Sequence, residues 1–244
     1  MESAGEIDPN RLRDLATLEG SLAQRVYLAV KECILSLDFA PGAILRKGEI
    51  CDALGVSRSP VSEALTRLSE DGLVDIVPQS GSRVSYFAMS EIREGAFLRE
   101  ALELAAAAKV ARDRSEDQLM RLNRNLRLQA LLVEDDDHAG FFEADQEFHA
   151  MLMRFTGYGR VSEIAEAVSA QVLRARILLL PEPGRVPDTI VEHEAILDAI
   201  RARDPDAVRA AMRHHLGQLM PRIEVLSRAR PELFNRPQDS KRTA

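Results

Sequence analysis

The sequence has few of the features that mark a secreted or membrane protein. Its 244 residues include only two cysteines, Cys33 and Cys51, which lie in different expected helices and without CxxC spacing. This usage indicates a reducing compartment and no disulfide framework. No apolar run approaches the roughly 20 residues of a membrane-spanning helix, and the acidic start MESAGEIDPN lacks the apolar core of a signal peptide. We therefore expect a soluble, cytoplasmic protein with no membrane partner.

An excess of positive charge is also missing, since the formal net charge is −7. This balance argues against a broadly basic surface, although it leaves room for a local basic patch. A hydrophobic content of 45% with 29% charged residues is ordinary for a soluble chain that builds a core. The length is enough for one large domain or two modest ones.

Residues 21–87 combine helical segments with one short hairpin. Apolar residues spaced three and four apart indicate the helices, Gly55 is placed to stop the second helix, and Ser57 is placed to cap the third. Alternating apolar residues on both sides of the turn PQSGS (78–82) indicate the hairpin. The expected elements are helices at about 22–37, 47–54 and 57–71 and strands at 73–77 and 83–87. This order, with a tight turn between the last two helices, is typical of a winged helix-turn-helix domain.

From about residue 90 the chain has the apolar spacing of helices throughout. Six helical segments are expected, starting at about 91, 116, 138, 160, 188 and 205. The predicted fold class is therefore mainly α: an N-terminal winged helix-turn-helix followed by a C-terminal all-α bundle of six to seven helices. The predicted domains are an N-terminal arm (1–20), the winged helix (21–87), the helical domain (90–228) and a disordered tail (229–244).

The third helix of the winged domain has the layout of a DNA-recognition helix. Its apolar stripe consists of Val61, Ala64, Leu65 and Leu68, while Arg58, Ser59, Ser62 and Thr66 lie off this stripe. A recognition helix presents such residues to base edges in the major groove, where Arg58 can bind guanine through two hydrogen bonds. The hydroxyl groups of Ser57 and Ser59, with the N–H groups of the first turn, suit a phosphate. Gln79 to Arg83, with Gly81 allowing close approach, would form the wing.

The charge balance leaves a second interpretation open, a small structural or protein-binding winged helix. Residues 21–87 contain seven Lys and Arg against eight Asp and Glu, a net charge of −1. A protein that coats DNA without sequence preference would be more basic. A sequence-specific reader needs only a local cluster of cations. The candidates for such a cluster are Arg46, Lys47, Arg58 and Arg83.

The stretch ADQEFH (144–149) places a carboxylate and a histidine on one side of a helix, one turn apart. Asp145 falls within the apolar stripe of the helix at 138–155, and His149 lies at the edge of that stripe. Two further histidines, His193 and His215, also lie on the apolar faces of their helices. An aspartate on an apolar face is costly unless it is paired or binds a cation.

Two interpretations of these four residues stay open on periodicity alone. A single inward histidine is more often a hydrogen-bonded core residue, and Asp145 with His149 can be a simple buried pair. One oxygen and three nitrogen donors together suit zinc, nickel or a similar divalent ion, with coordination positions left open for a ligand.

The N-terminal motifs resemble those of a known family of DNA-binding proteins. The stretch APGAILRKGEICDALGVSRSPVSEALTRLSEDGLVDIVPQSGSRVS is similar to the N-terminal domain of the GntR family of bacterial transcription regulators. The shared features are PG before the second helix, LGVSR-x-PV-x-EAL-x-RL, GLV and a P-x-x-G-x-x-V wing. The resemblance implies binding to a double-stranded DNA operator. The candidate DNA contacts are Arg46, Lys47, Ser57, Arg58, Ser59, Ser62, Arg67, Gln79, Gly81 and Arg83.

One position departs from the pattern of that family. Members usually carry an arginine directly before the Glu of the EAL segment, where it helps to hold DNA, and this chain has Ser62 there.

The C-terminal half resembles the FCD domain, the all-helical ligand-binding domain of the FadR-type branch of the same family. The matching pieces are RxALE (99–103), DxEFH (145–149), EHxAIL (192–197) and MRxHL (212–216). In metal-containing members these motifs hold a divalent ion, and a small carboxylate effector takes the open coordination positions. The resemblance therefore implies a divalent transition metal, Zn or Ni, bound by Asp145, His149, His193 and His215.

Arginines are the candidates for direct contact with such an effector. Arg99 borders the inward face of its helix, where relatives often place an effector-binding arginine; the alternative is a surface ion pair with Glu103. Arg174 and Arg176 flank the inward Ala175 and are candidates for the same task, and Arg174 is taken as the second effector residue.

Together these motifs predict a homodimeric transcription regulator of the repressor type rather than an enzyme. Its winged helices would bind a pseudo-palindromic operator, and a metal-anchored effector would control operator affinity. The alternative is a metal-dependent hydrolytic enzyme with an accessory winged-helix domain, in which the four metal ligands would activate water. That alternative lacks an evident general base and leaves the DNA-reading helix without a purpose.

Overall fold

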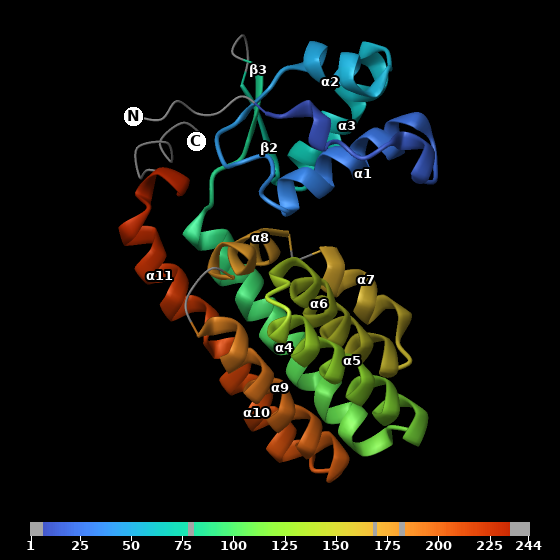
Figure 1. Cartoon of the computed structure of the whole chain (residues 1–244), viewed down its shortest axis with the longest axis vertical. Helices are drawn as coiled ribbons and strands as arrows, with labels where there is room; N and C mark the ends of the chain where they lie inside the picture. Colours follow the sequence, from blue (N-terminus) through green and yellow to red (C-terminus); the bar gives the residue numbers. More distant parts are fainter. Residues whose placement is uncertain (1–6, 78–80, 168–169, 181–183, 235–244) are drawn as a thin grey trace. The chain divides into compact units, whose positions relative to one another are not determined.

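The structure is a computed structural model that describes residues 7–77, 81–167, 170–180 and 184–234 (Figure 1). Its contacts divide the chain into two compact units. The first comprises Met1–Met89 together with Ser227–Ala244, and the second comprises Ser90–Leu226. No helix in the described part of the chain is long and apolar enough to cross a membrane.

The first unit contains the three predicted helices of the winged domain. They are α1 (Leu22–Leu35), α2 (Lys47–Leu54) and α3 (Arg58–Glu70). Gly55 ends α2 in the left-handed conformation, with φ of 63°, which a residue without a side chain adopts at little cost. The predicted apolar stripe of α3 is buried against the rest of the unit: Val61, Ala64, Leu65 and Leu68.

The wing is a three-stranded antiparallel sheet rather than a simple hairpin. It consists of β1 (Ile44–Leu45), β2 (Val74–Val77) and β3 (Gly81–Val84), in the order β1-β3-β2. The predicted return strand at 83–87 therefore begins and ends earlier than expected. The two-residue strand β1 is too short to leave a periodic signal in the sequence, and its pairing with β3 shows only in three dimensions.

The C-terminal end of the described chain differs from the predicted disordered tail at 229–244. Residues Pro231–Leu233 form a 3-10 helix. The Phe87 N–H donates a hydrogen bond to the carbonyl of Leu233 at 2.9 Å. The rings of Phe87 and Phe234 are 5.5 Å apart, and both side chains are buried. Burial of two aromatic rings orders this segment; the predicted tail at 235–244 lies outside the described residues.

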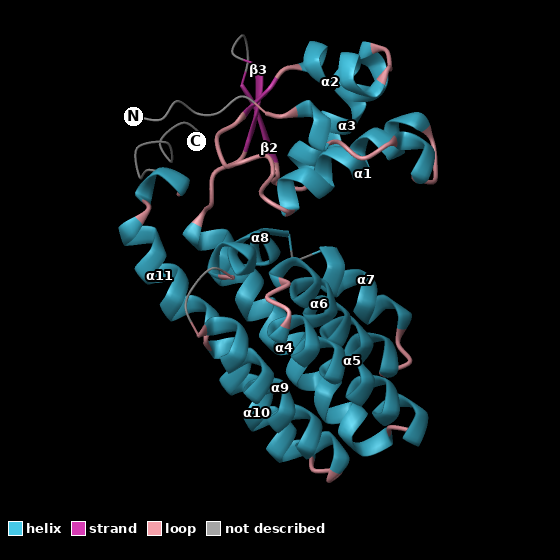
Figure 2. Ribbon diagram, viewed as in Figure 1, coloured by secondary structure: helices cyan, strands magenta, loops and turns pink. Residues whose placement is uncertain are grey.

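In its described residues the second unit consists of helices and the loops that connect them (Figure 2). Its helices, within the described residues, are α4 (Met89–Asp113), α5 (Glu116–Glu134), α6 (His138–Phe155), α7 (Gly159–Ala167), α8 (Ala170–Leu179), α9 (Arg185–Arg201), α10 (Pro205–Gly217) and α11 (Leu219–Ala229). The predicted capping box of Ser115 and Gln118 opens α5, and Asp204 caps α10. The predicted fold class, a winged helix-turn-helix followed by an all-α bundle, is confirmed.

The helix boundaries differ from the expected ones at three places. The segment expected at 160–180 is described as α7 and α8, on either side of residues 168–169, which lie outside the description. The last expected helix is two helices, which part at Gln218. The helix α9 starts at Arg185 after Gly184, whose φ is 80°, so the predicted cap Asp188 lies inside the first turn. The loop sequence gave no apolar period by which to place that start.

The core of the second unit joins α4, α5, α6, α9 and α10. Four small or short side chains of α4, Ala107, Ala108, Val110 and Ala111, let the neighbouring helices approach closely. Phe148 and Leu152 on α6 are fully buried in this core. Burial of such a side chain stabilises a fold by about 1.5–3 kcal/mol. The packing fixes the inward faces of α6, α9 and α10, on which the aspartate and histidines of interest lie.

Candidate functional site

The structure brings the four predicted metal ligands together inside the second unit. Asp145 and His149 lie one turn apart on α6, His193 lies on α9 and His215 on α10. Each offers a donor atom, and these atoms all lie within 4.8 Å of one another. All four residues are buried, with 0–6% of their surface exposed. Helix α6 and the consecutive helices α9 and α10 thus converge on one polar point in an apolar core.

Each of the three histidines is oriented through its Nδ1 atom. Nδ1 of His149 lies 2.6 Å from Glu103 Oε2, Nδ1 of His193 lies 2.9 Å from Gln129 Oε1, and Nδ1 of His215 lies 2.6 Å from Glu192 Oε2. An oxygen acceptor at each Nδ1 requires that this nitrogen carry the proton. The tautomer is therefore assigned from the hydrogen-bond network, and it leaves a lone pair on every Nε2.

These lone pairs converge without a donor between them. The Nε2 atoms of His149 and His215 are 3.2 Å apart, and both are acceptors in the assigned tautomer. His193 Nε2 lies 3.6 Å from Asp145 Oδ1, and it is buried with no hydrogen-bond partner among the described residues. A buried unsatisfied polar atom costs about 1–3 kcal/mol. A cation at this point would satisfy all three nitrogens and the carboxylate, so the donor set fits a divalent metal.

The protonation states favour the same chemistry. Burial lowers the pKa of His149, and burial together with the nearby histidines and arginines lowers the pKa of His193 and of His215 far more. Neutral imidazole is the form that binds a metal. Burial opposes the ionisation of Glu103, but Arg99 and His149 hold its pKa well below its usual range. The histidines are thus kept neutral while the acceptor behind His149 stays charged.

The three oxygen acceptors behind the histidines were not predicted from the sequence. Glu103 enters the sequence motifs through RxALE and as a possible partner of Arg99, and Glu192 through EHxAIL, in neither case as an acceptor for a histidine. Both lie on inward faces, which is the signal that could have identified them. Gln129 on α5 is fully buried, yet no motif or spacing in the sequence marks it. Such groups orient metal-binding histidines and raise their basicity.

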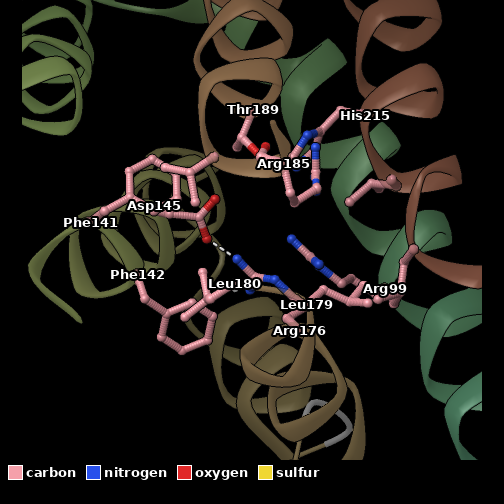
Figure 3. Close-up of a pocket in the computed structure, with 13 residues that line it drawn as sticks. Arg99, Phe141, Phe142, Asp145, Arg176, Leu179, Leu180, Arg185, Thr189 and His215 are labelled. Carbon is pink, nitrogen blue, oxygen red and sulfur yellow. Dashed lines mark hydrogen bonds and ion pairs between the residues drawn. The ribbon is translucent and has the colours of Figure 1, made fainter. Parts of the chain in front are cut away.

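A cavity of about 40 Å³ adjoins this cluster and shares Asp145 and His215 with it (Figure 3). Its apolar and hydroxyl lining comes from Phe141, Phe142, Leu179, Leu180, Val186, Thr189, Leu216 and Leu219. Three arginines, Arg99, Arg176 and Arg185, complete the wall. The volume corresponds to a few water molecules, so the cavity suits a small polar ligand placed against Asp145 and His215.

Each of the three arginines is held by one carboxylate. Arg99 Nε donates to Glu103 Oε1 at 2.6 Å, and Arg185 Nη1 donates to both oxygens of Glu192 at 3.1 and 3.2 Å. Arg176 forms an ion pair with Asp145, drawn as a dashed line in Figure 3. Arg99 therefore does pair with Glu103, but its side chain is only 10% exposed, so this is not a surface ion pair.

The second predicted effector residue lies elsewhere. Arg174 is fully buried, donates from Nη1 to Gln171 Oε1 at 3.2 Å and is not among the residues that line the cavity. Arg176, the other arginine that flanks Ala175, lines the cavity at the place that was predicted for Arg174. Arg185 was not singled out from the sequence, because it lies in the loop PEPGRVPD, where no apolar period shows which way a side chain faces.

On the winged helix, the predicted DNA contacts at the start of α3 are accessible. Ser57, Arg58 and Ser59 are exposed, and Ser57 occupies the cap position without a capping hydrogen bond from its side chain. Lys47, at the start of α2, and Gly81, at the start of β3 with φ of 93°, are also exposed, and Ser62 is half-buried. The predicted contact Gln79 lies outside the described residues.

Three predicted DNA-binding arginines have partners within the unit. Arg46 pairs with Glu49 at 2.9 Å and Arg83 with Asp75 at 3.4 Å, both near the surface. Such exposed pairs are weak, so either guanidinium can turn to a phosphate at small cost. Arg67 is different: its Nη1 donates to Gln24 at 2.5 Å and its guanidinium lies 4.3 Å from the ring of Tyr27. This places Arg67 in the packing against α1.

Comparison with known proteins gives two family matches and several whole-chain relatives. The FCD domain model matches residues 94–218, and the model for bacterial regulatory proteins of the gntR family matches residues 22–84. An HTH-type transcriptional regulator in an unstable DNA locus of Streptomyces ambofaciens is 36% identical over 209 residues, which is 86% of this chain and 88% of that protein. The HTH-type transcriptional repressor RspR of Escherichia coli K12 is 32% identical over 212 residues, 87% of this chain and 93% of its own.

Solved structures show the same fold. Escherichia coli McbR/YncC superposes with a TM-score of 0.73 at 21% identity, over 85% of this chain and 99% of its own. A GntR transcriptional regulator from Rhodococcus sp. RHA1 also gives 0.73, at 25% identity, over 84% of this chain and 99% of its own.

Proposed function

Because this chain belongs to the GntR family of transcription regulators and carries an FCD domain, we propose that its effector site is built on a divalent transition metal. The chain is a transcription regulator with a DNA-binding GntR domain and an FCD effector-binding domain. The metal would be held by Asp145, His149, His193 and His215, and Zn or Ni suits three imidazoles and one carboxylate. Its effector would be a small carboxylate in the adjoining cavity.

The observation that carries this proposal is the convergence of three Nε2 lone pairs in a buried core. Two of these atoms are 3.2 Å apart, and their opposite ring nitrogens already donate to Glu103 and Glu192. A purely structural cluster would place a proton donor between the two rings. The pattern of an acceptor behind every histidine is instead that of metal-binding histidines.

When bound, the metal supplies positive charge and open coordination positions against the cavity. Glu103, Gln129 and Glu192 hold the imidazole rings in place, and the buried rings of Phe141 and Phe142 line the cavity, where they would exclude water from a bound anion. Low water content strengthens electrostatic contacts to an anion in the site. The lining contains no carboxylate besides Asp145 among the described residues. This favours anion binding over the hydrolytic alternative, which needs a general base next to the metal.

Control of operator affinity requires that the effector bind two arrangements of the protein unequally. The helix α4 is the element that can carry this difference. It bears Arg99 and Glu103 at the site, and its first residue, Met89, directly continues the DNA-binding unit. A shift of α4 on effector binding would therefore change the path of the chain into the winged helix. The protein would act as a homodimer whose two recognition helices read paired half-sites.

The similarity to a curated relative supports repression of transcription as the effect of operator binding. The Escherichia coli relative RspR is described as a transcriptional repressor. On this proposal, α3 would read the operator through Arg58, and release or retention of DNA would depend on the loaded site.

The test is operator affinity measured with and without metal and carboxylate. An operator fragment selected in vitro would be titrated with wild-type protein, His193→Ala and His138→Ala, the last a matched control because His138 is half-exposed at the start of α6. We expect metal plus carboxylate to change the operator Kd of the wild type and of His138→Ala about tenfold, a coupling of ordinary size, and to leave His193→Ala unchanged. An identical response in all three proteins would contradict the proposal.

A further inference from the structure

The charges around the cavity are balanced only as long as no metal is present. Three arginines face three carboxylates in pairs: Arg99 with Glu103, Arg176 with Asp145, and Arg185 with Glu192. The carboxylate side chains are 4–8% exposed and the arginine side chains 10–17% exposed. The formal charge of this set is therefore zero, and a divalent ion at the histidines would raise it to about two positive charges in a site with little water.

The arginines also retain hydrogen-bonding capacity toward the cavity. Arg99 uses Nε for Glu103, while its Nη2 is buried with no hydrogen-bond partner in the part of the chain that the structure describes. Arg185 donates to the two carboxylate oxygens of Glu192 from Nη1, at 3.1 and 3.2 Å. A guanidinium has five N–H donors and binds a carboxylate through two of them. Figure 3 shows Arg99, Arg176 and Arg185 turned toward the same space between Asp145 and His215.

Arg176 would be redirected by the metal. Its guanidinium pairs with Asp145, which is also a candidate metal ligand. If Asp145 also held a metal, its negative charge would be shared between the dication and the guanidinium of Arg176. The metal would thus release a cation in the cavity at the moment when it adds two charges of its own.

Resting on the proposed function, we propose that the effector is a short dicarboxylate whose two carboxylates bind at separate places. One carboxylate would take the open positions of the metal, and the other would be held by Arg99 and Arg185. A dianion neutralises the two added charges, whereas a monocarboxylate leaves one of them buried without a counter-charge. The three arginines come from α4, from α8 and from the start of α9, so they spread the positive charge along the cavity instead of focusing it at one point. That spread favours two carboxylates over a single phosphate group.

The test uses acids matched in carbon skeleton on the zinc-loaded full chain. Malonate would be compared with propionate and succinate with butyrate by calorimetry, with inorganic phosphate as a further probe. We expect the better diacid to bind at least about tenfold more tightly than its matched monoacid, the size of one charge-assisted contact. Bound zinc would be quantified in every sample.

One variant and a matched control test whether Arg185 binds the second carboxylate of the effector. Arg185→Gln is expected to lower diacid affinity about tenfold and to leave monoacid affinity within about threefold, because only the diacid reaches this side chain. Arg201→Gln is the matched control, since Arg201 lies exposed on the same helix and pairs with Asp198. Both variants must retain zinc, which shows that the site is folded.

Equal binding of diacid and monoacid by the zinc-loaded wild type would overturn the dicarboxylate inference while leaving metal-anchored carboxylate binding intact. Tighter binding of phosphate than of either diacid would also overturn it and would point to a phosphorylated ligand. Loss of zinc binding in the wild type would be a failure of the proposed function itself and would show before any acid is added.

Discussion

The two units carry their functional residues in opposite ways. On α3 the predicted DNA contacts Ser57, Arg58 and Ser59 are consecutive and exposed, and they belong to one helix. In the helical unit the four candidate ligands come from three helices and are 0–6% exposed. The DNA-contacting residues of α3 are oriented by the apolar stripe of that one helix, which packs against the rest of the unit. The buried site depends on five helices, because Glu103 on α4 and Gln129 on α5 hold two of its rings.

Because of this difference in exposure and in the number of contributing helices, we expect the two sites to respond differently to substitution. A change on α3 alters what the helix meets outside the protein and leaves the fold of the unit intact. A change in the buried site alters the fit of several helices at once, so its effects on ligand binding and on stability are coupled.

The largest effect is expected in the DNA-binding unit, at its contact with the C-terminal segment. Phe234→Ala should lower the free energy of unfolding of this unit by about 3 kcal/mol, the cost of removing a buried phenylalanine side chain. This loss of unfolding free energy would be measured by amide hydrogen exchange at Phe87 at increasing concentrations of a chemical denaturant. Phe97→Ala is the control, since Phe97 is 72% exposed and its loss should change stability by less than about 0.5 kcal/mol. Equal effects of both changes would contradict the packing of Phe234 on Phe87.

Removal of metal should destabilise the helical unit alone. A metal present at a hundred times its Kd stabilises the folded state by about 2.7 kcal/mol, and a chelator removes that contribution. Calorimetry with and without chelator, in wild type and His215→Ala, would show a lowered Tm of one transition in the wild type only. A lower Tm for the unfolding transition of the DNA-binding unit in the chelated sample would contradict the prediction that the metal stabilises the helical unit alone.

Two arginines on α3 should separate contact with DNA from packing. Arg58→Ala should weaken operator binding by about 2 kcal/mol and relax preference at one base pair, as expected for loss of a bidentate contact. Arg67→Ala should instead lower thermal stability, because Arg67 holds Gln24 and covers the ring of Tyr27. Fluorescence anisotropy on the selected operator and its single-base variants would measure the first effect, and thermal unfolding the second. If Arg67→Ala lost operator affinity and Arg58→Ala did not, Arg67 rather than Arg58 would be the residue that contacts DNA.

The smallest effect is expected behind the histidines. Gln129→Leu removes the acceptor of the His193 Nδ1–H and should weaken metal binding about tenfold, the lower end for such orienting groups. Competition with a chelator of known affinity would measure it. Gln118→Leu, at the capping box of the same helix, controls for a general loss of α5 stability, and it should leave metal affinity unchanged. Unaltered affinity in Gln129→Leu would mean that His193 is oriented by packing alone.

Much of the DNA-binding unit could be predicted from the sequence because its signals are local. The stripe of α3 and the stop at Gly55 both follow from spacing and backbone preference over a few residues. The strand β1 escaped prediction because two residues carry no period. The packing of Phe234 on Phe87 escaped because its partners are separated by more than half of the chain.

In the helical unit, periodicity identified the inward positions of Asp145, His193 and His215 but not their meeting point. That convergence was implied by the resemblance to the FCD domain, and the structure supplies its geometry. Periodicity could not distinguish Arg174 from Arg176, because both flank the inward Ala175, and only Arg176 lines the cavity. Gln129 is the extreme case, since a buried glutamine whose partner His193 lies 64 residues further along the chain leaves no mark in a single sequence.

The measurement that tests the central claim most directly is the metal content of the native protein. Protein purified without chelator or affinity metal would be analysed by elemental mass spectrometry beside His215→Ala and His214→Ala, two neighbours on α10 of which only His215 is buried. We predict close to one divalent transition metal per chain in the wild type and in His214→Ala, and its loss in His215→Ala. Absence of metal from all three, even after reconstitution with Zn and Ni, would contradict the account and leave the cluster a buried polar network.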